Sequence, residues 1–448
     1  MGPRGSTSTH GRRWSRHAGP IRRRRRSTWA SRRRADPGLR QRLHTVATGC
    51  KRAEFDIEGS SCKRWRGVGA GSSSPVRIGV VGLGAVAQAV HLPLLQKHPE
   101  RFRIAALCDL SRGTRDGIGA RYGVTEERRF ARAEELYGAS GLDAVAILTT
   151  GSHAALAGAA AGAGLAVFCE KPLAYSLGEI DELASVDPVL QLGYMKLYDP
   201  AVERAVAVLA ERPAPRSIEV TVLHPPSAPQ LAHAGLLSPA GDVGTDELAR
   251  LASDEATALE RALGQAPRWV GELYGEVFLG SVVHELAVIR ALAGGGLELD
   301  DADVWPTERT DGSVALQGRL PDGARVSIRW HYLEGYPAYR EEVRIHHDRG
   351  SVELTFPAPY LLHAPTVLTV VDADGEAERV TRTRSTVEAF ERQWLAFESL
   401  VRTGEPPRAG LDEGREDVLV CQSAARVVAA RHDVEIGGEA AAQFSELA

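Results

Sequence analysis

The stretch "VRIGVVGLGAVAQAVHLPLL" at residues 76–95 decides the fold. Its first six residues form a run rich in β-branched side chains, which is typical of a strand buried in a parallel sheet. The pattern G-x-G-x-x-A follows, and the residues after it have the apolar spacing of a helix. Because strand, glycine-rich turn and helix come in this order, the stretch predicts the phosphate-binding turn of a dinucleotide-binding domain.

Each small residue of the turn has a physical task. The first glycine permits the tight turn, and the second lets the backbone approach a pyrophosphate at the N-terminus of the helix. The alanine at the end keeps the helix close to the strand. The predicted cofactor-binding positions of the turn are Gly82, Gly84, Ala85, Val86 and Ala87.

A second strand, "FRIAALCD", ends at Asp109. This acid lies 25 residues beyond Gly84, close to the spacing of a carboxylate that accepts hydrogen bonds from the adenosine ribose. A carboxylate there favours NAD, whereas Arg112 is placed to pair with the extra phosphate of NADP. The sequence therefore predicts NAD or NADP as cofactor, with a preference for NAD; an exposed turn aspartate is the alternative interpretation.

Helices and strands continue to alternate beyond this point. The pattern predicts helices at 113–122, 132–139 and 153–163, and strands at 143–150 and 166–170. Such alternation indicates a parallel, doubly wound α/β sheet, in which ligands bind outside the carboxyl ends of the strands. The stretch "FCEKPLA" (168–174) lies at such an end. Pro172 restricts Lys171 to an extended conformation, so Lys171 and Glu170 are candidates for the rim of a catalytic cleft.

Length and composition limit the class of protein. The chain has 448 residues, enough for two domains, and its 43% apolar content is that of a globular protein. Its apolar runs are shorter than the ~20 residues that a membrane span needs. The five cysteines are scattered, which argues against a zinc site or a disulfide framework and suits a reducing cytoplasm. We therefore expect a cytoplasmic protein with no metal site and no membrane partner.

The charge is distributed unevenly. Residues 1–74 carry 19 Lys and Arg against 4 Asp and Glu, whereas the remaining residues carry 35 against 54. An arginine-rich tail suggests a nucleic-acid partner, but the run lacks the interleaved aromatic residues that stack on bases. We expect residues 1–75 to be a disordered extension and linker, or sequence upstream of the true start, so nucleic-acid binding is not expected.

At this point the sequence resembles the glucose–fructose oxidoreductase / inositol dehydrogenase / rhizopine catabolism (Gfo/Idh/MocA) family. The resemblance covers residues 76–430 and rests on these stretches: "GLGAVAQAVHLPLL", "TTGSH", "AGLAVFCEKPLA", "QLGYMKLYDPA", "SVVHELAVIRALAG" and the C-terminal helical segment from "TVEAFERQWLAFESL" onward.

The resemblance implies an architecture and an activity. It implies a Rossmann domain that binds NAD(P), followed by an α/β domain with a large, mostly antiparallel open sheet, and a homodimer or homotetramer. It implies an enzyme that moves hydride between nicotinamide and a secondary carbinol of a sugar, cyclitol or polyol. The expected divisions are 1–75 (extension), 76–195 (NAD(P)-binding), 196–435 (substrate binding and oligomerisation) and 436–448 (tail). The alternating segments in the second half agree, since they predict antiparallel strands at 217–224, 313–320, 324–333, 341–348, 351–356 and 366–373.

The resemblance also assigns roles to residues. Lys171 is implied to be catalytic and to bind substrate. His284 fits the position of a histidine that moves the carbinol proton. Many members carry an acid four residues before this histidine, but here Gly280 stands there, and Glu285 points about 100° away on a helix. A catalytically weak sensor or scaffold is therefore the alternative function.

Other candidates complete the predicted site. A tyrosine is the alternative proton donor, with Tyr198 as the first candidate and Tyr194 or Tyr274 as alternatives. Lys196 is expected to contact substrate. Further cofactor contacts are expected from Thr149, His153, Glu170 and Lys171. Residues 225–275 are expected to be an insertion on the substrate side, in which Trp269 and Tyr274 either shape the pocket or belong to the core.

Overall fold

The computed structural model describes residues 74–237, 240–305 and 312–442. All of these residues belong to one compact unit. Except for Ser74 and Pro75, the extension predicted for residues 1–75 lies outside the described residues. Of the predicted tail, residues 436–442 are described and include the short helix α13 (Gly438–Ala442).

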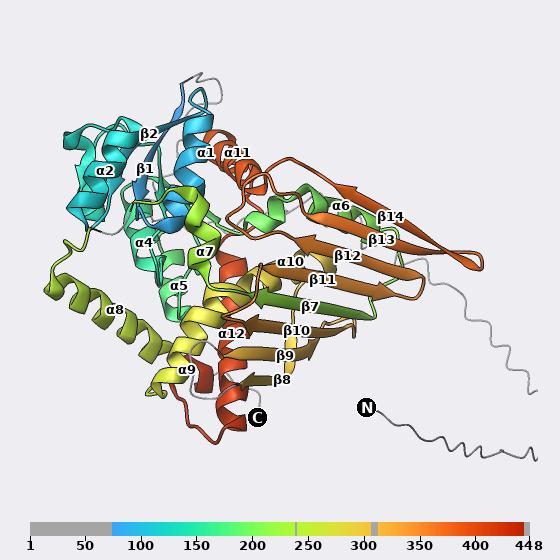
Figure 1. The fold of residues 1–448 in the computed structure, drawn as a ribbon. Coiled ribbons are helices and arrows are strands. Elements are labelled where there is room, and N and C mark those ends of the chain that lie inside the picture. The colour runs from blue at the N-terminus through green and yellow to red at the C-terminus, as the bar shows by residue number, and fades with distance from the viewer. Residues whose placement is uncertain (1–73, 238–239, 306–311, 443–448) are drawn as a thin grey trace, which may run out of the picture. The chain divides into compact units, whose positions relative to one another are not determined.

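The first half of the fold is a six-stranded parallel sheet with strand order β3-β2-β1-β4-β5-β6 (Figure 1). This order is that of a doubly wound dinucleotide-binding sheet, and it confirms the fold class predicted from the alternation of strands and helices. The strands are β1 (Val76–Val81), β2 (Phe102–Cys108), β3 (Arg129–Phe130), β4 (Ala144–Ile147), β5 (Ala166–Cys169) and β6 (Leu190–Leu192).

Helices cover both faces of this sheet, because successive strand residues point to opposite faces and both sets are apolar. Val145, Ile147 and Val167 belong to the cluster that includes residues of α3, α4 and α5. Ile78, Ala146 and Phe168 belong to the cluster on the other face. The helices of this half are η2 (Ala87–His91, a π-helix), α1 (Leu92–Lys97), α2 (Arg112–Tyr122), η3 (Glu126–Arg128), α3 (Ala133–Tyr137), α4 (Ala154–Gly162) and α5 (Leu177–Ala184).

A helix from near the C-terminus completes the second face. Helix α11 (Ala389–Thr403) places Trp394 against Phe168 of β5, with the ring centroids 4.5 Å apart and nearly parallel. Trp394 also donates from Nε1 to His91 Nδ1 at 3.2 Å. The core of the dinucleotide-binding sheet therefore depends on residues more than 200 positions away in the sequence.

The second half is an eight-stranded sheet of order β14-β13-β12-β11-β7-β10-β9-β8 (Figure 1). All neighbouring strands are antiparallel except β7 and β10, so the expected mostly antiparallel sheet is confirmed. The strands are β7 (Ser217–His224), β8 (Glu298–Trp305), β9 (Ser313–Arg319), β10 (Arg325–Tyr332), β11 (Arg340–His347), β12 (Gly350–Phe356), β13 (Val367–Asp374) and β14 (Ala377–Arg384).

Helices lie against one face of this sheet and link it to the first half (Figure 1). These are α6 (Pro200–Leu209), α10 (Val283–Ala293) and α12 (Leu411–Arg431). The connections contain η4 (Met195–Tyr198), α7 (Ser227–Leu231), η5 (Ala232–Ala234), α8 (Thr245–Leu263), α9 (Arg268–Glu272) and the π-helix η6 (Leu273–Val282). In the part of the chain that the structure describes, no helix is both long and apolar enough to cross a membrane.

Candidate active site

The glycine-rich turn after β1 has the geometry that a phosphate-binding turn requires. Gly82 has a φ of +88°, and a Cβ atom there would lie 2.7 Å from the backbone nitrogen of Thr149. A side chain is therefore excluded at Gly82 by both conformation and space. A Cβ atom on Gly84 would meet nothing within 4 Å, so the turn has open space beside it. The turn fits a dinucleotide pyrophosphate, which needs close backbone approach at the start of a helix.

Asp109, directly after β2, is held against this turn. Its Oδ2 accepts a hydrogen bond from the amide of Leu83 at 2.9 Å, and its Oδ1 accepts from the amide of Ser111 at 2.9 Å. Each carboxylate oxygen can accept a further bond, so the residue fits its predicted contact with ribose hydroxyls. Arg112 points into solvent, with its side chain 84% exposed and its Nε 3.5 Å from Asp116.

Two loops at the carboxyl edge of the sheet are joined through His153. This buried residue precedes α4, and its Nδ1 and Nε2 lie 2.6 Å and 2.9 Å from the carbonyl oxygens of Pro172 and Thr149. Burial lowers the pKa of His153, although both carbonyls act in the opposite direction. Since both ring nitrogens face backbone carbonyls, His153 positions the loops; its predicted contact with a cofactor stays a prediction. The buried Oγ1 of Thr149 has no hydrogen-bond partner among the described residues.

Glu170 and Lys171 lie where β5 ends, as the sequence predicts for a strand of this sheet. Glu170 is buried, and its Oε1 lies 3.2 Å from Nε2 of His91. Burial raises the pKa of Glu170, but His91 and Lys171 outweigh this and lower it, so Glu170 carries a negative charge at neutral pH. A Cβ atom on Gly193 would lie only 2.8 Å from the same oxygen, so this carboxylate is tightly enclosed.

Lys171 reaches across to the second half of the fold. Its Nζ donates a hydrogen bond to the backbone carbonyl of Gly280 in η6. Burial lowers the pKa of Lys171, and the charge of Lys196 adds to this, whereas Glu170 and Glu285 oppose it. Lys171 therefore meets a neutral carbonyl rather than a paired carboxylate.

His284, in the first turn of α10, is near this lysine. Burial lowers its pKa well below the usual value, and the charges of Lys171 and Lys196 lower it further. The imidazole is therefore neutral at neutral pH and able to accept a proton. Its Nδ1 is buried and has no hydrogen-bond partner among the described residues. The ring packs edge-on against Tyr194, with the centroids 6.0 Å apart.

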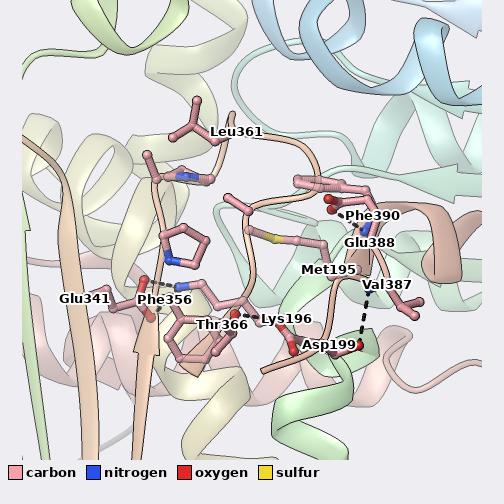
Figure 2. A pocket seen from close by; sticks show the side chains of 16 residues that line it. Met195, Lys196, Asp199, Glu341, Phe356, Leu361, Thr366, Val387, Glu388 and Phe390 are labelled. Atoms are coloured by element: carbon pink, nitrogen blue, oxygen red, sulfur yellow. Dashed lines mark hydrogen bonds and ion pairs between the residues drawn. The ribbon is translucent and has the colours of Figure 1, made fainter. Parts of the chain in front are cut away.

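Lys196, in η4, has a different environment. Its Nζ lies 2.6 Å from both oxygens of Glu341 and 3.1 Å from Oε1 of Glu285. Figure 2 shows this lysine reaching Glu341 beside the ring of Phe356, whose centroid lies 5.2 Å from Nζ. The adjoining cavity measures about 50 Å³, enough for a few water molecules but not for a sugar. The predicted contact of Lys196 with substrate stays a prediction, since its charge is balanced by protein carboxylates.

The three tyrosines considered as proton donors all have hydroxyl partners. Tyr198 accepts from the amide of Arg408 at 3.2 Å and packs under its guanidinium. Tyr194 donates to Asp417, and Tyr274 donates to the carbonyl of Tyr175 at 2.5 Å. Burial raises the pKa of all three above the usual value, which disfavours their ionisation.

Comparisons with known proteins agree with this geometry. Residues 76–187 match the model of the oxidoreductase family with an NAD-binding Rossmann fold, GFO_IDH_MocA. The chain is 25% identical over 346 residues to inositol 2-dehydrogenase 1 of Saccharopolyspora erythraea, covering 74% of this chain and 87% of that protein.

Residues 76–187 therefore match the Rossmann domain of the Gfo/Idh/MocA oxidoreductase family. Solved structures share its fold. Myo-inositol 2-dehydrogenase from Lactobacillus plantarum aligns over 82% of this chain and 99% of that one, with a TM-score of 0.59 and 16% identity. A 3-ketoreductase from Actinomadura kijaniata, solved with NADP and TDP-benzene, aligns over 79% of this chain and 98% of that one, with a TM-score of 0.60 and 18% identity.

At Gly280 the chain lacks the acid that the resemblance implies. Gly280 lies in a π-helix that ends at Val282, whereas His284 lies in the α-helix that follows. A side chain at position 280 would begin 3.2 Å from the carbonyl of Gly275, so the site is crowded. What the position supplies instead is its own backbone carbonyl, which accepts from Lys171.

Sequence reasoning missed His224, the last residue of β7. The parallel register between β7 and β10 sets it opposite Tyr332. Its ring centroid lies 5.5 Å from those of Trp330 and Tyr339. Burial lowers the pKa of His224, and the charge of Lys171 lowers it further, so these residues are close to the lysine. The only sequence signal was a strand that ends in histidine, paired with one that ends in aromatic residues.

This aromatic group connects back to the lysine through η6. Trp330 donates from Nε1 to Oγ of Ser281 at 2.9 Å, and Ser281 directly follows Gly280. The aromatic residues of the second sheet and Lys171 of the first sheet therefore meet at the same helical segment. Trp269, by contrast, lies by His432, with their ring centroids 5.9 Å apart.

Proposed function

We propose that this protein is an NAD(P)-dependent dehydrogenase that acts on a secondary carbinol of a sugar, cyclitol or related polyol, or reduces the corresponding ketone. The observation that carries the proposal is Lys171: it follows a Rossmann strand at the ligand-binding edge, has a lowered pKa, and bonds to a neutral carbonyl. Its relatives are named as inositol dehydrogenases, and one structural neighbour as a 3-ketoreductase solved with NADP and TDP-benzene.

The residues of this chain divide the work of binding and proton transfer. The turn Gly82–Ala87 and Asp109 would hold the pyrophosphate and the adenosine ribose, and a bound nicotinamide supplies the hydride acceptor or donor. Lys171 donates a hydrogen bond to the reacting oxygen and favours its negative charge. His284 is neutral and accepts the carbinol proton at its imidazole during oxidation, then returns it during reduction.

Residues of the second sheet support the proposed substrate class. Rings of His224, Trp330 and Tyr339 form an aromatic group near Lys171. Aromatic faces pack well against the C–H groups of a ring-shaped polyol, while lysine and histidine bind its hydroxyl groups. A neutral cyclic polyol therefore fits this environment better than a polyanion.

The direct test is the absorbance of reduced nicotinamide during turnover. The full chain is mixed with NAD or NADP and with single inositols, aldoses, ketoses and sugar nucleotides. We expect turnover with at least one cyclic polyol or sugar, and a large loss in His284→Asn with dinucleotide binding retained. Tight dinucleotide binding without turnover over the whole panel would contradict the enzyme and favour a sensor or scaffold.

We also propose that the regions 76–195 and 196–435 act as cofactor-binding and substrate-binding domains of a cytoplasmic homodimer or homotetramer. One face of the large sheet packs against α6, α10 and α12, whereas Glu219, Gln317 and Arg329 on the other face are exposed. This exposed face is the proposed contact between copies. A molar mass of one chain by light scattering at micromolar concentration would contradict it.

A further inference from the structure

The segment that connects β7 to α8 belongs to the second half of the sequence but contacts the dinucleotide-binding half of the fold. Leu237 donates from its amide to Oε1 of Gln88 at 2.8 Å, and Gln88 donates from Nε2 to the carbonyl of Leu83 in the glycine-rich turn. Gly117 of α2 faces the same segment, since a Cβ atom there would lie 2.7 Å from Leu237. The segment is therefore fitted against both the turn and α2.

The same segment places a carboxylate at the start of α2. Oδ2 of Asp242 accepts from the amide of Gly113 at 2.8 Å. A Cβ atom on Gly113 would lie 2.6 Å from that of Ala240, so the backbone approach depends on glycine. Figure 1 shows the chain passing the end of α2 before it enters α8. The bonds from Ser111 and the Gly113 amide lower the pKa of Asp242, so its carboxylate is charged at neutral pH.

This carboxylate lies next to the position predicted for the adenosine ribose. Ser111 donates from its amide to Asp109 and contributes a side-chain hydrogen bond to Asp242. The two acids therefore share one short turn. In doubly wound sheets an extra phosphate on the ribose would lie beside the acid after the second strand, where amides at a helix start would receive it. One of those amides, Gly113, is already bonded to Asp242.

Two cations lie near this turn, and each already has a partner. Arg112 is 84% exposed and lies 3.5 Å from Asp116. Arg115 donates from Nη1 to the carbonyls of Asp109 and Leu110, which holds it along the backbone. Both arginines therefore have partners other than an incoming phosphate.

We propose that Asp242 makes this site selective for NAD over NADP. Its carboxylate occupies the position that a ribose phosphate would take, and its negative charge repels that phosphate. The inference rests on the proposed dinucleotide-dependent function and adds to it a specificity residue supplied by the second half of the chain. Like charges placed together are a common means of rejecting an unwanted ligand. Asp109 alone does not decide the matter, because its neighbour Arg112 acts in the opposite direction.

The test compares binding of the two cofactors rather than turnover. Isothermal titration calorimetry of the full chain gives the Kd of NAD and of NADP for wild type and for Asp242→Asn. Asparagine keeps an oxygen acceptor for the Gly113 amide and removes the charge. We expect the ratio of the NADP Kd to the NAD Kd to fall about five- to tenfold, since exposed charge pairs act weakly and a phosphate carries nearly two charges. The Kd of NAD should stay within about twofold.

Matched variants separate charge from damage to the fold. Asp246→Asn removes an exposed carboxylate at the start of α8 and should leave the ratio unchanged. Asp242→Glu keeps the charge and should retain most of the preference for NAD. If the asparagine variant proves unstable, this variant still tests whether the preference depends on the charge. Adenosine 2′,5′-bisphosphate and AMP, as probes of the adenosine end alone, should show the same change in ratio.

The outcomes are distinct. Wild type that binds NADP as tightly as NAD, or an unchanged ratio in Asp242→Asn, overturns the role of Asp242 and leaves the dinucleotide proposal standing. Wild type that binds neither dinucleotide overturns the proposed function itself. A preference for NAD that weakens in Asp242→Asn and not in Asp246→Asn supports the inference.

Discussion

Lys171 and Lys196 are both largely enclosed and close enough to influence each other, yet their pKa values shift in opposite directions. Burial lowers the pKa of Lys171, and its hydrogen-bond acceptor is a neutral backbone carbonyl. Burial also disfavours the charge of Lys196, but Glu341 and Glu285 outweigh it and raise the pKa. The difference comes from the partners and not from the depth of burial.

The comparison indicates which lysine is available for chemistry. A lysine held between two carboxylates has its charge already balanced, and moving it would leave buried acids unpaired. A lysine bonded to a neutral carbonyl can direct one of its three N–H donors to a substrate oxygen without leaving a buried charge unpaired. The family motif points to Lys171, and the electrostatics of the two sites independently favour the same residue.

The largest expected effect is on turnover in Lys171→Ala. Loss of the donor to the reacting oxygen should lower kcat/KM by about 10²- to 10⁴-fold, the usual range for a positioned proton or hydrogen-bond group. The reduced-nicotinamide assay measures it, and calorimetry should find NAD binding changed far less. Lys97→Ala, which removes an exposed lysine paired with Glu391, is the matched control and should leave turnover unchanged. Equal losses in the two variants would contradict the catalytic assignment.

Lys196→Met should act on stability instead. Removing this charge leaves Glu285 and Glu341 buried without their cation, which typically costs about 3–5 kcal/mol in the free energy of unfolding. Urea denaturation measures the change. Lys97→Met is again the control, because its ion pair is exposed and contributes about 1 kcal/mol or less. A loss no greater than that of the control would show that the enclosed pair does not hold the fold together.

Much of the fold was predictable from sequence, and the exceptions have physical causes. Strands with alternating apolar residues, such as β7, β10 and β11, were found. Strands β8 and β14 were missed because Asp300, Asp301 and Asp303 interrupt the first and nearly every residue of the second is exposed. An edge strand lacks a second neighbour and often carries charges that discourage further pairing, so its sequence does not alternate.

The candidate site was predictable where motifs are local. The turn Gly82–Ala87, Asp109 and Glu170–Lys171 each follow a strand, and parallel strands bring their carboxyl ends to one edge. Contacts from the second half were not predictable. Nothing near Gly280 in the sequence indicates that its carbonyl accepts from Lys171, and nothing near Asp242 indicates a bond to Gly113. Such contacts depend on tertiary packing between segments about 110 to 130 residues apart.

The smallest expected effect is a change in the pH dependence of stability at Glu285, the acid whose charge raises the pKa of both lysines. Burial raises its pKa to about 7 from 4.5, although Lys196 opposes this shift. Between these two values the folded protein keeps a proton that the unfolded chain has lost, so the contribution of Glu285 to the free energy of unfolding falls as pH rises from about 4.5 to about 7. Above pH 7 the contribution is constant.

Glu285→Gln removes this titration. The free energy of unfolding of the variant minus that of wild type should therefore rise with pH across the window, by at most about 1.4 kcal/mol per pH unit, and level off above it. Urea denaturation from pH 5 to 8 measures the difference. Burial also raises the pKa of Asp417 to about 7, but Asp417 is common to both proteins and cancels. Glu342→Gln on β11 should give a flat difference. A flat difference for Glu285→Gln as well would mean that Lys196 holds this acid ionised throughout, which would place it with Glu341 as a fixed counter-charge.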